Sequence, residues 1–178
     1  TIMQMDKGLD TGAILLERQV AIEADETSTS LFAKLTAVGC EAIVEALASL
    51  ATLKPRPQPD SGATYAKKIE KSEARIDWTR PADEIERRLR AFDPFPGGES
   101  LLGEEVVKVW RGEVVAGDTA LGVGVMPGTI LAASPGNLIV TCGQQALRLQ
   151  VLQKRGGKRM SADDFLRGSA VCAGMVFA

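Results

Sequence analysis

The spacing of apolar side chains predicts a strand, a loop, a second strand and a long helix over residues 1–50. A short apolar run, Thr1–Asp6, and a β-rich run, Ala13–Ile22, flank the turn-forming sequence Lys7–Gly12. Apolar residues then recur at spacings of three and four after a cap at Thr27 or Ser28, which predicts a helix. Two strands and one helix bury too little surface to fold alone. We therefore expect the end of an α/β domain whose beginning lies outside this chain.

The later pattern predicts a helix followed by short strands. Thr79 and Pro81 suit the start of the helix, and Ile85, Leu89 and Phe92 form its apolar stripe. The expected ion pairs along this helix are Glu84–Arg88 and Glu86–Arg90. The expected strands are Val106–Val115, Gly128–Ala132, Leu138–Cys142 and Ala146–Leu152, with a capping box at Ser161–Asp164 for a short helix. Short strands between Gly-rich turns predict a mainly β, OB-like barrel.

A proline-rich segment separates the two patterns. Leu53–Gly62 has proline at every second position at its centre and lacks apolar periodicity, which favours an extended spacer. We therefore expect an α/β remnant at 1–52, a linker at 53–72 and an OB-like domain at 73–178.

Composition excludes several classes of protein. Apolar residues make up 45% of the chain, and no run approaches the roughly 18 apolar residues of a membrane-spanning helix. No signal peptide is visible. The net charge is −2, but acidic residues outnumber basic ones before residue 63 and the reverse holds after it. A polyanionic partner would therefore meet the second part of the chain.

Two absences limit the chemistry. The chain has no histidine, so it cannot by itself build a Ser-His-Asp triad, a Cys-His pair or a His-ligated metal site. Its cysteines, Cys40, Cys142 and Cys172, form no CxxC motif, and we expect buried free thiols in a reducing compartment. These observations predict a cytosolic, metal-free protein.

Two carboxylates are candidates for chemistry in the first loop. Asp10 lies between Gly8 and Gly12, which let backbone approach a ligand, and a carboxylate on such a loop can accept a proton. Asp6 is its rival, and the spacing does not choose between them. Asp and Gly are also ordinary turn formers.

A basic loop is the second candidate. Lys154, Arg155, Lys158 and Arg159 surround a glycine pair, an arrangement that can follow a phosphate backbone or simply be solvated. A second basic run comprises Lys67, Lys68, Lys71 and Arg75. With an OB-like barrel, these segments fit single-stranded or structured RNA better than duplex DNA. We expect both tryptophans, Trp78 and Trp110, in the core.

Several motifs together resemble the methionyl-tRNA formyltransferase family. They are Thr1–Gly12 (TIMQMDKGLDTG), Ala74–Trp78 (ARIDW), Arg90–Gly97 (RAFDPFPG), Val107–Trp110 (VKVW), Gly128–Leu131 (GTIL) and Gly157–Gly168 (GKRMSADDFLRG). The resemblance covers essentially the whole chain but only the later part of the family's chain. GLDTG is shared with other formyltetrahydrofolate-using transferases, whereas RAFDPFPG followed by GKRMSADDFL is more specific.

The resemblance implies formyl transfer from 10-formyltetrahydrofolate to the amino group of methionyl initiator tRNA. It implies the end of a Rossmann-like catalytic domain at 1–52, with Asp10 as the catalytic aspartate that assists proton transfer. Gly8, Leu9, Asp10 and Gly12 would line the folate site. The residues expected to contact tRNA are Lys154, Arg155, Lys158, Arg159 and Arg88. The family implies a cytoplasmic monomer without a metal or a membrane partner.

The family's catalytic asparagine and histidine lie upstream of the part that this chain matches. We therefore expect that the 178 residues do not turn over by themselves. Phe95 stands where the family often has tryptophan. Three alternatives stay open: part of a sugar-nucleotide formyltransferase, a stand-alone RNA-binding module, and an inert fragment.

Overall fold

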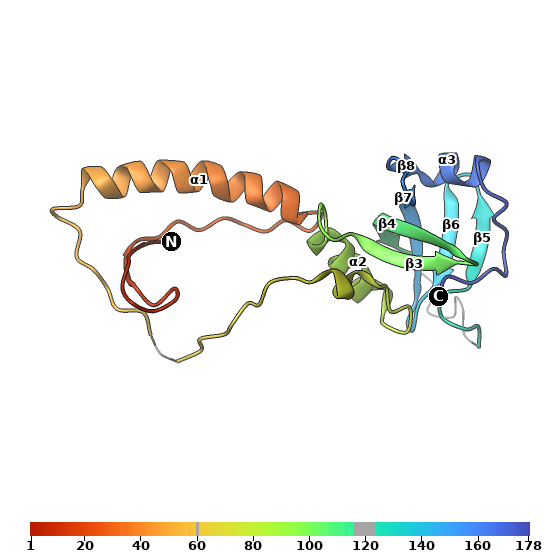
Figure 1. The fold of residues 1–178 in the computed structure, drawn as a ribbon, viewed down its shortest axis with the longest axis horizontal. Helices are drawn as coiled ribbons and strands as arrows, with labels where there is room; N and C mark the ends of the chain where they lie inside the picture. Colours follow the sequence, from red (N-terminus) through yellow and green to blue (C-terminus); the bar gives the residue numbers. More distant parts are fainter. Residues whose placement is uncertain (60, 116–123) are drawn as a thin grey trace. The chain divides into compact units, whose positions relative to one another are not determined.

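A computed structural model describes residues 1–59, 61–115 and 124–178. The chain forms two compact units, Thr1–Lys68 and Ile69–Ala178 (Figure 1). One position of the expected linker, 60, lies outside the described residues. Within the described ranges, no helix is both long and apolar enough to cross a membrane.

The first unit contains one hairpin and one long helix. Strand β1 (Ile2–Gln4) pairs antiparallel with β2 (Ala13–Leu16), and α1 spans Ser28–Ala48. The order strand, loop, strand, helix matches the sequence pattern. β2 is shorter than the predicted run Ala13–Ile22, and it ends at Leu16. The residues from 17 to 22 lie outside any strand, and Ile22, predicted to be in the strand, is 69% exposed.

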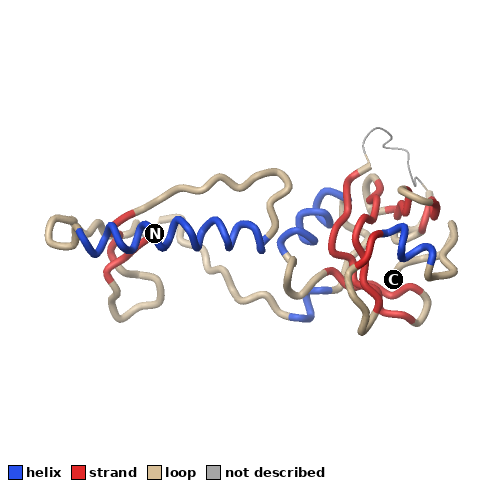
Figure 2. Tube along the Cα trace, turned by 90° about the horizontal axis from the view of Figure 1, so that it is seen from above, coloured by secondary structure: helices blue, strands red, loops and turns tan. Residues whose placement is uncertain are grey.

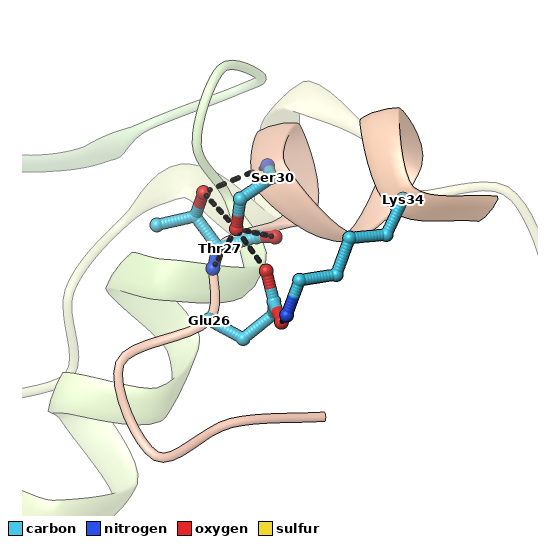
Figure 3. Close-up of polar contacts among 4 residues, drawn as sticks. All are labelled: Glu26, Thr27, Ser30 and Lys34. Carbon is cyan, nitrogen blue, oxygen red and sulfur yellow. Dashed lines mark hydrogen bonds and ion pairs between the residues drawn. The ribbon is translucent and has the colours of Figure 1, made fainter. Parts of the chain in front are cut away.

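Helix α1 begins at the predicted cap, Thr27. The Thr27 hydroxyl accepts the Ser30 N–H at 3.2 Å, and the Ser30 hydroxyl accepts the Thr27 N–H at 3.0 Å, so each residue caps the other (Figure 3). Lys34 and Ser30 both donate to the Glu26 carboxylate. The Lys34 hydrogen bond, followed by that of Ser30, lowers the pKa of Glu26. These contacts fix the point at which the chain enters the helix.

Part of the proline-rich segment, which belongs to the first unit, is hydrogen-bonded to the hairpin of β1 and β2. Arg56 exchanges two backbone hydrogen bonds with Ile14 of β2, at 2.7 and 2.9 Å. The Gln58 side-chain amide donates to the carbonyls of Asp10 and Gly12, at 2.8 and 2.7 Å. The alternation of proline with other residues leaves the Arg56 N–H free to pair. The start of the expected spacer is therefore joined to the hairpin.

In its described residues, the second unit is a mostly antiparallel sheet with two α-helices and a 3₁₀ turn. Its elements are η1 (Lys71–Ala74), α2 (Ala82–Ala91), β3 (Gly98–Leu102), β4 (Glu105–Val114), β5 (Ile130–Ser134), β6 (Asn137–Thr141), β7 (Ala146–Lys154), β8 (Met160–Ser161) and α3 (Ala162–Arg167). The strand order is β3-β4-β7-β6-β5, and β8 pairs with β7. The strands are coloured red in Figure 2. The runs Leu138–Cys142 and Ala146–Leu152, predicted as strands, form the antiparallel hairpin of β6 and β7, in which Val140 lies opposite Leu147.

The core of this unit is built from the predicted stripes. Ile85 and Leu89 of α2, Val140 of β6 and Leu149 of β7 are each at most 3% exposed and belong to one apolar cluster. Both tryptophans are buried, as predicted. Phe165 of α3 is also fully buried, so the capping box at Ser161 introduces a helix that packs on the sheet.

The predicted closed barrel is not found. In the described ranges, no regular strand pairing joins the edge strands β3 and β5. The segment Gly174–Ala178 hydrogen-bonds to both edges instead. Ala178 exchanges two bonds of 2.9 Å with Leu101 of β3, and Ile130 of β5 donates to Met175 at 2.8 Å and accepts from Gly174 at 2.8 Å. This pairing was not predicted from the sequence. The segment forms two isolated bridges, Leu102–Phe177 and Thr129–Val176, rather than a regular strand that a sequence pattern would reveal.

Candidate functional site

The loop between β1 and β2 is closed by Asp6. Its carboxylate accepts the Gly8 N–H at 2.9 Å and the Thr11 hydroxyl at 2.5 Å. The Thr11 hydrogen bond, and then that of Gly8, lowers the pKa of Asp6 below its ordinary value. Asp6 is therefore a structural residue that shapes this loop.

The two loop glycines serve the packing of the loop itself. A Cβ added at Gly8 would lie 2.2 Å from Thr11 Oγ1, and one added at Gly12 would lie 2.1 Å from the Gln4 carbonyl oxygen. The sequence suggested that these glycines leave room for a ligand. In the structure, the atoms that approach them are the chain's own.

Asp10 differs from Asp6 in both backbone and side chain. It adopts a left-handed conformation with φ of 55°, and its carbonyl oxygen accepts from Gln58. Its carboxylate makes no hydrogen bond or ion pair with any other described residue. Asp10 and its neighbour Leu9, which is 74% exposed, both face solvent. Both rival carboxylates are exposed, but Asp6 accepts two hydrogen bonds, whereas the Asp10 carboxylate has no partner among the described residues.

The basic loop follows β7, and two of its four cations are held by the protein. The Lys154 ammonium donates to the Gly168 carbonyl at 2.7 Å and lies 5.5 Å from the centre of the Phe165 ring. The Arg159 guanidinium donates to Asp93 at 2.8 Å and lies 3.5 Å from the centre of the Trp110 ring. The contacts of Lys154 anchor the beginning of the loop, and those of Arg159 anchor its end.

Arg155 and Lys158 occupy the middle of the same loop. Their side chains form no hydrogen bond or ion pair within residues 1–59, 61–115 and 124–178, and both residues are exposed. Arg155 lines an open groove of about 390 Å³ together with Lys108 and Glu99, which form an ion pair at 3.1 Å. The loop thus presents two uncompensated cations beside a groove.

Arg88 lies on α2 and is held by backbone rather than by the predicted ion pair. Its guanidinium donates to the Glu73 carbonyl at 3.1 Å and lies 5.3 Å from the centre of the Phe92 ring. The predicted Glu84–Arg88 pair is wrong, because Glu84 pairs with Arg80 at 3.5 Å. The predicted Arg90–Glu86 pair forms at 2.6 Å.

The prediction of three buried thiols is correct for Cys142 alone. Burial raises the pKa of the Cys142 thiol to about 12. Cys40, on the solvent side of α1, and Cys172 are exposed, and all three thiols are free. Within the described ranges, no group of three or more Cys, His, Asp or Glu side chains could hold a metal ion.

Comparisons with known proteins place both units in one family. The family described as "Formyl transferase, C-terminal domain" matches residues 68–170, and "Formyl transferase" matches residues 1–47. Proteins named methionyl-tRNA formyltransferase from Burkholderia multivorans and Burkholderia ambifaria are 49% and 50% identical over 183 aligned residues. Those alignments cover 100% of this chain and 54% of each relative, so the chain spans about half of their length.

Solved structures with a similar fold share little sequence. A variant of HypX from Aquifex aeolicus has a TM-score of 0.68 and 19% identity, with 93% of this chain and 29% of that chain covered. HypX in complex with tetrahydrofolic acid has a TM-score of 0.66, with 92% and 29% covered. At this identity the likeness shows the fold alone.

Proposed function

The chain belongs to the formyl transferase family, and from this we propose that it is the later part of a methionyl-tRNA formyltransferase. The observation that carries the proposal is identity of about 50% over the entire chain to proteins of that name. The reaction is formyl transfer from 10-formyltetrahydrofolate to the amino group of methionyl initiator tRNA. The protein acts in the cytoplasm, in keeping with its free thiols.

The loop between β1 and β2 supplies the acid–base chemistry. The bound 10-formyltetrahydrofolate would supply the formyl group. The exposed Asp10 carboxylate would accept the proton that the methionyl amine loses as its nitrogen bonds to the formyl carbon. The bond from that carbon to N10 of the donor would then break, and tetrahydrofolate would leave with a proton on N10. Leu9 offers an exposed apolar contact to the folate, while Gly8 and Gly12 set the shape of the loop. Asp6 holds the loop closed and takes no part in proton transfer.

The second unit holds the tRNA. Arg155 and Lys158 offer uncompensated cations to phosphates, and Lys154, Arg159 and Arg88 are further cations of the same unit. We assign this unit to an OB-like class, in which the segment Gly174–Ala178 takes the place of regular pairing between the edge strands.

A salt titration of tRNA binding tests the RNA half of this proposal. We expect the 178-residue chain to bind methionyl initiator tRNA with an affinity that falls steeply with salt. The slope of log K against log salt is negative. Arg155→Gln and Lys158→Gln should each make it shallower, by about 0.7 to 0.9. A folded chain that binds no tRNA, or binds it without salt dependence, contradicts the proposal. Formylation of an aminosugar nucleotide by a chain completed to the length of its relatives would then favour the sugar-nucleotide alternative.

A formylation assay tests the role of Asp10. In a chain completed to the length of its relatives, Asp10→Asn should lower the rate of formyl transfer by roughly 100-fold or more, the size of a lost general base. The same variant should leave tRNA affinity unchanged. We expect no transfer by the 178 residues alone, which span 54% of the relatives and contain no histidine. Full activity of the Asp10→Asn variant would remove Asp10 from the mechanism.

A further inference from the structure

Three segments that are far apart in the sequence meet at the Trp110 indole. Trp110 lies on β4 and is 8% exposed. The backbone of Gly97 packs against its ring so closely that an added Cβ would lie 2.8 Å from the ring edge. From the basic loop, the Arg159 guanidinium lies 3.5 Å from the ring centre. The indole therefore joins the segment after α2 to the loop after β7.

Gln153 extends this junction into the middle of the loop. Its side-chain oxygen accepts the Trp110 indole N–H at 2.8 Å, and its side-chain amide donates to the Gly157 carbonyl at 2.7 Å. An indole can only donate and a carbonyl can only accept, so one glutamine satisfies both partners. Gly157 belongs to the glycine pair, which is the part of the loop with the most backbone freedom.

Asp93 supplies a second tether. Its carboxylate accepts from Arg159 at 2.8 Å and is 20% exposed, whereas the Arg159 side chain is 41% exposed. This pair holds Arg159 over the indole. Gln153 fixes the glycine pair and Asp93 fixes the far end, so Arg155 and Lys158 are presented from a loop that is tied on both sides of them.

We propose that Trp110, Gln153 and Asp93 are positioning residues that hold the 154–159 loop in its RNA-binding conformation. Arg155 and Lys158 then make the phosphate contacts, and Lys154 and Arg159 chiefly anchor the loop. A loop ordered before binding loses less conformational freedom when it meets the RNA. This inference rests on the proposed function, in which that loop binds tRNA.

The Asp93→Asn variant distinguishes a net-charge effect from a positioning role, because the two predict opposite changes in tRNA affinity. If only net charge matters, removal of a negative charge beside a polyanion site raises the tRNA affinity. If Asp93 positions the loop, the affinity falls, by about 10-fold or more for a lost charged hydrogen bond. Asp93→Glu keeps the carboxylate and should restore most of the affinity. The control, Glu113→Gln, removes a carboxylate that pairs with Arg148 at 3.3 Å and should not weaken binding.

Gln153→Met removes both hydrogen bonds and no charge. We expect tRNA affinity to fall by about 3- to 10-fold. The matched control is Gln150→Met, which changes the other glutamine of β7, whose amide donates to Glu113 at 3.1 Å. This control should bind as the unchanged chain does. Equal affinities of the Gln153→Met and Gln150→Met variants would overturn the role of Gln153.

Trypsin cleavage without RNA separates this inference from the proposed function. Gln153→Met and Asp93→Asn should speed cleavage within residues 154–159 several-fold, read by mass spectrometry, at a temperature where each variant is folded. If the unchanged chain binds no tRNA, the proposed function fails, and faster cleavage still supports the tethered loop. Unchanged cleavage together with unchanged tRNA affinity in both variants overturns the inference.

Discussion

Asp6 and Asp10 occupy one loop, and the structure gives them different tasks. Asp6 accepts two hydrogen bonds that close the loop, whereas the Asp10 carboxylate is exposed. The sequence could identify the loop but could not rank the two carboxylates. Both lie among turn-forming residues, and the difference arises from the direction in which Thr11 and Gly8 donate.

An NMR titration distinguishes the two residues. Because hydrogen bonds lower the pKa of Asp6, the Gly8 amide shift should titrate with a midpoint below 3.8. The loop closure that Asp6 contributes is present above that ordinary value and is lost as the pH falls through the lowered pKa. Asp6→Asn should remove the titration of the Gly8 amide, and Asp10→Asn should preserve it. A midpoint at or above 3.8 would contradict the closed loop.

The three thiols should separate by reactivity. We expect Cys40 and Cys172 to react with a thiol reagent in the native chain, and Cys142 to react only after unfolding. Burial raises the Cys142 pKa to about 12, so little thiolate forms near neutral pH. The measurement is the thiol count before and after denaturant is added. Cys142→Ala should leave the native count unchanged, and rapid reaction of all three native thiols would refute its burial.

Among the elements, those encoded by local patterns were predicted best. The Thr27 cap of α1, the stripe of α2 and the hairpin of β6 and β7 follow from residues that are neighbours in sequence. Strand β3 was not predicted from the sequence. This strand begins with a glycine and two polar residues, Glu99 and Ser100, directly after a proline-rich turn, and therefore lacks the apolar alternation of a strand. Its Ser100 is buried by partners distant in sequence, since its hydroxyl accepts from Trp78 and donates to Ala178.

The cap of α3 gives a prediction for element stability. The Ser161 hydroxyl accepts the Asp164 N–H at 3.1 Å and introduces a helix whose Phe165 is fully buried. Ser161→Ala should lower the free energy of unfolding of the second unit by about 1 kcal/mol. Ser161→Thr retains a capping hydroxyl and should lose less. Denaturant titrations of the three chains provide the measurement, and equal midpoints would contradict the cap.

At the scale of the whole chain, apolar burial is concentrated in the second unit. The large core cluster lies entirely within residues 76–177, which supports independent folding of Ile69–Ala178. In the first unit, α1 exposes several large apolar side chains, among them Phe32 at 73% and Leu47 at 64%. An apolar helical face of this kind favours association with further surface.

We therefore expect the 178-residue chain to self-associate with rising concentration. Sedimentation velocity over a concentration series measures this. Residues 69–178 alone should remain monomeric, because they lack α1. Phe32→Ser with Leu47→Ser should reduce the association of the complete chain without altering α1, since both side chains are exposed. A chain that stays monomeric at every concentration would contradict this role for the exposed face.

The segment Gly174–Ala178 has a consequence for synthesis on the ribosome. The contact from Ser100 to Ala178 spans 78 positions, so β3 leaves the ribosome long before its partner in this segment exists. Contacts between such distant residues form late and slow the search for the native fold. Until then β5 and the Leu101 end of β3 lack this partner, and open strand edges are templates for wrong pairing with other chains. The nascent domain is thus most in need of a chaperone just before the segment Gly174–Ala178 emerges.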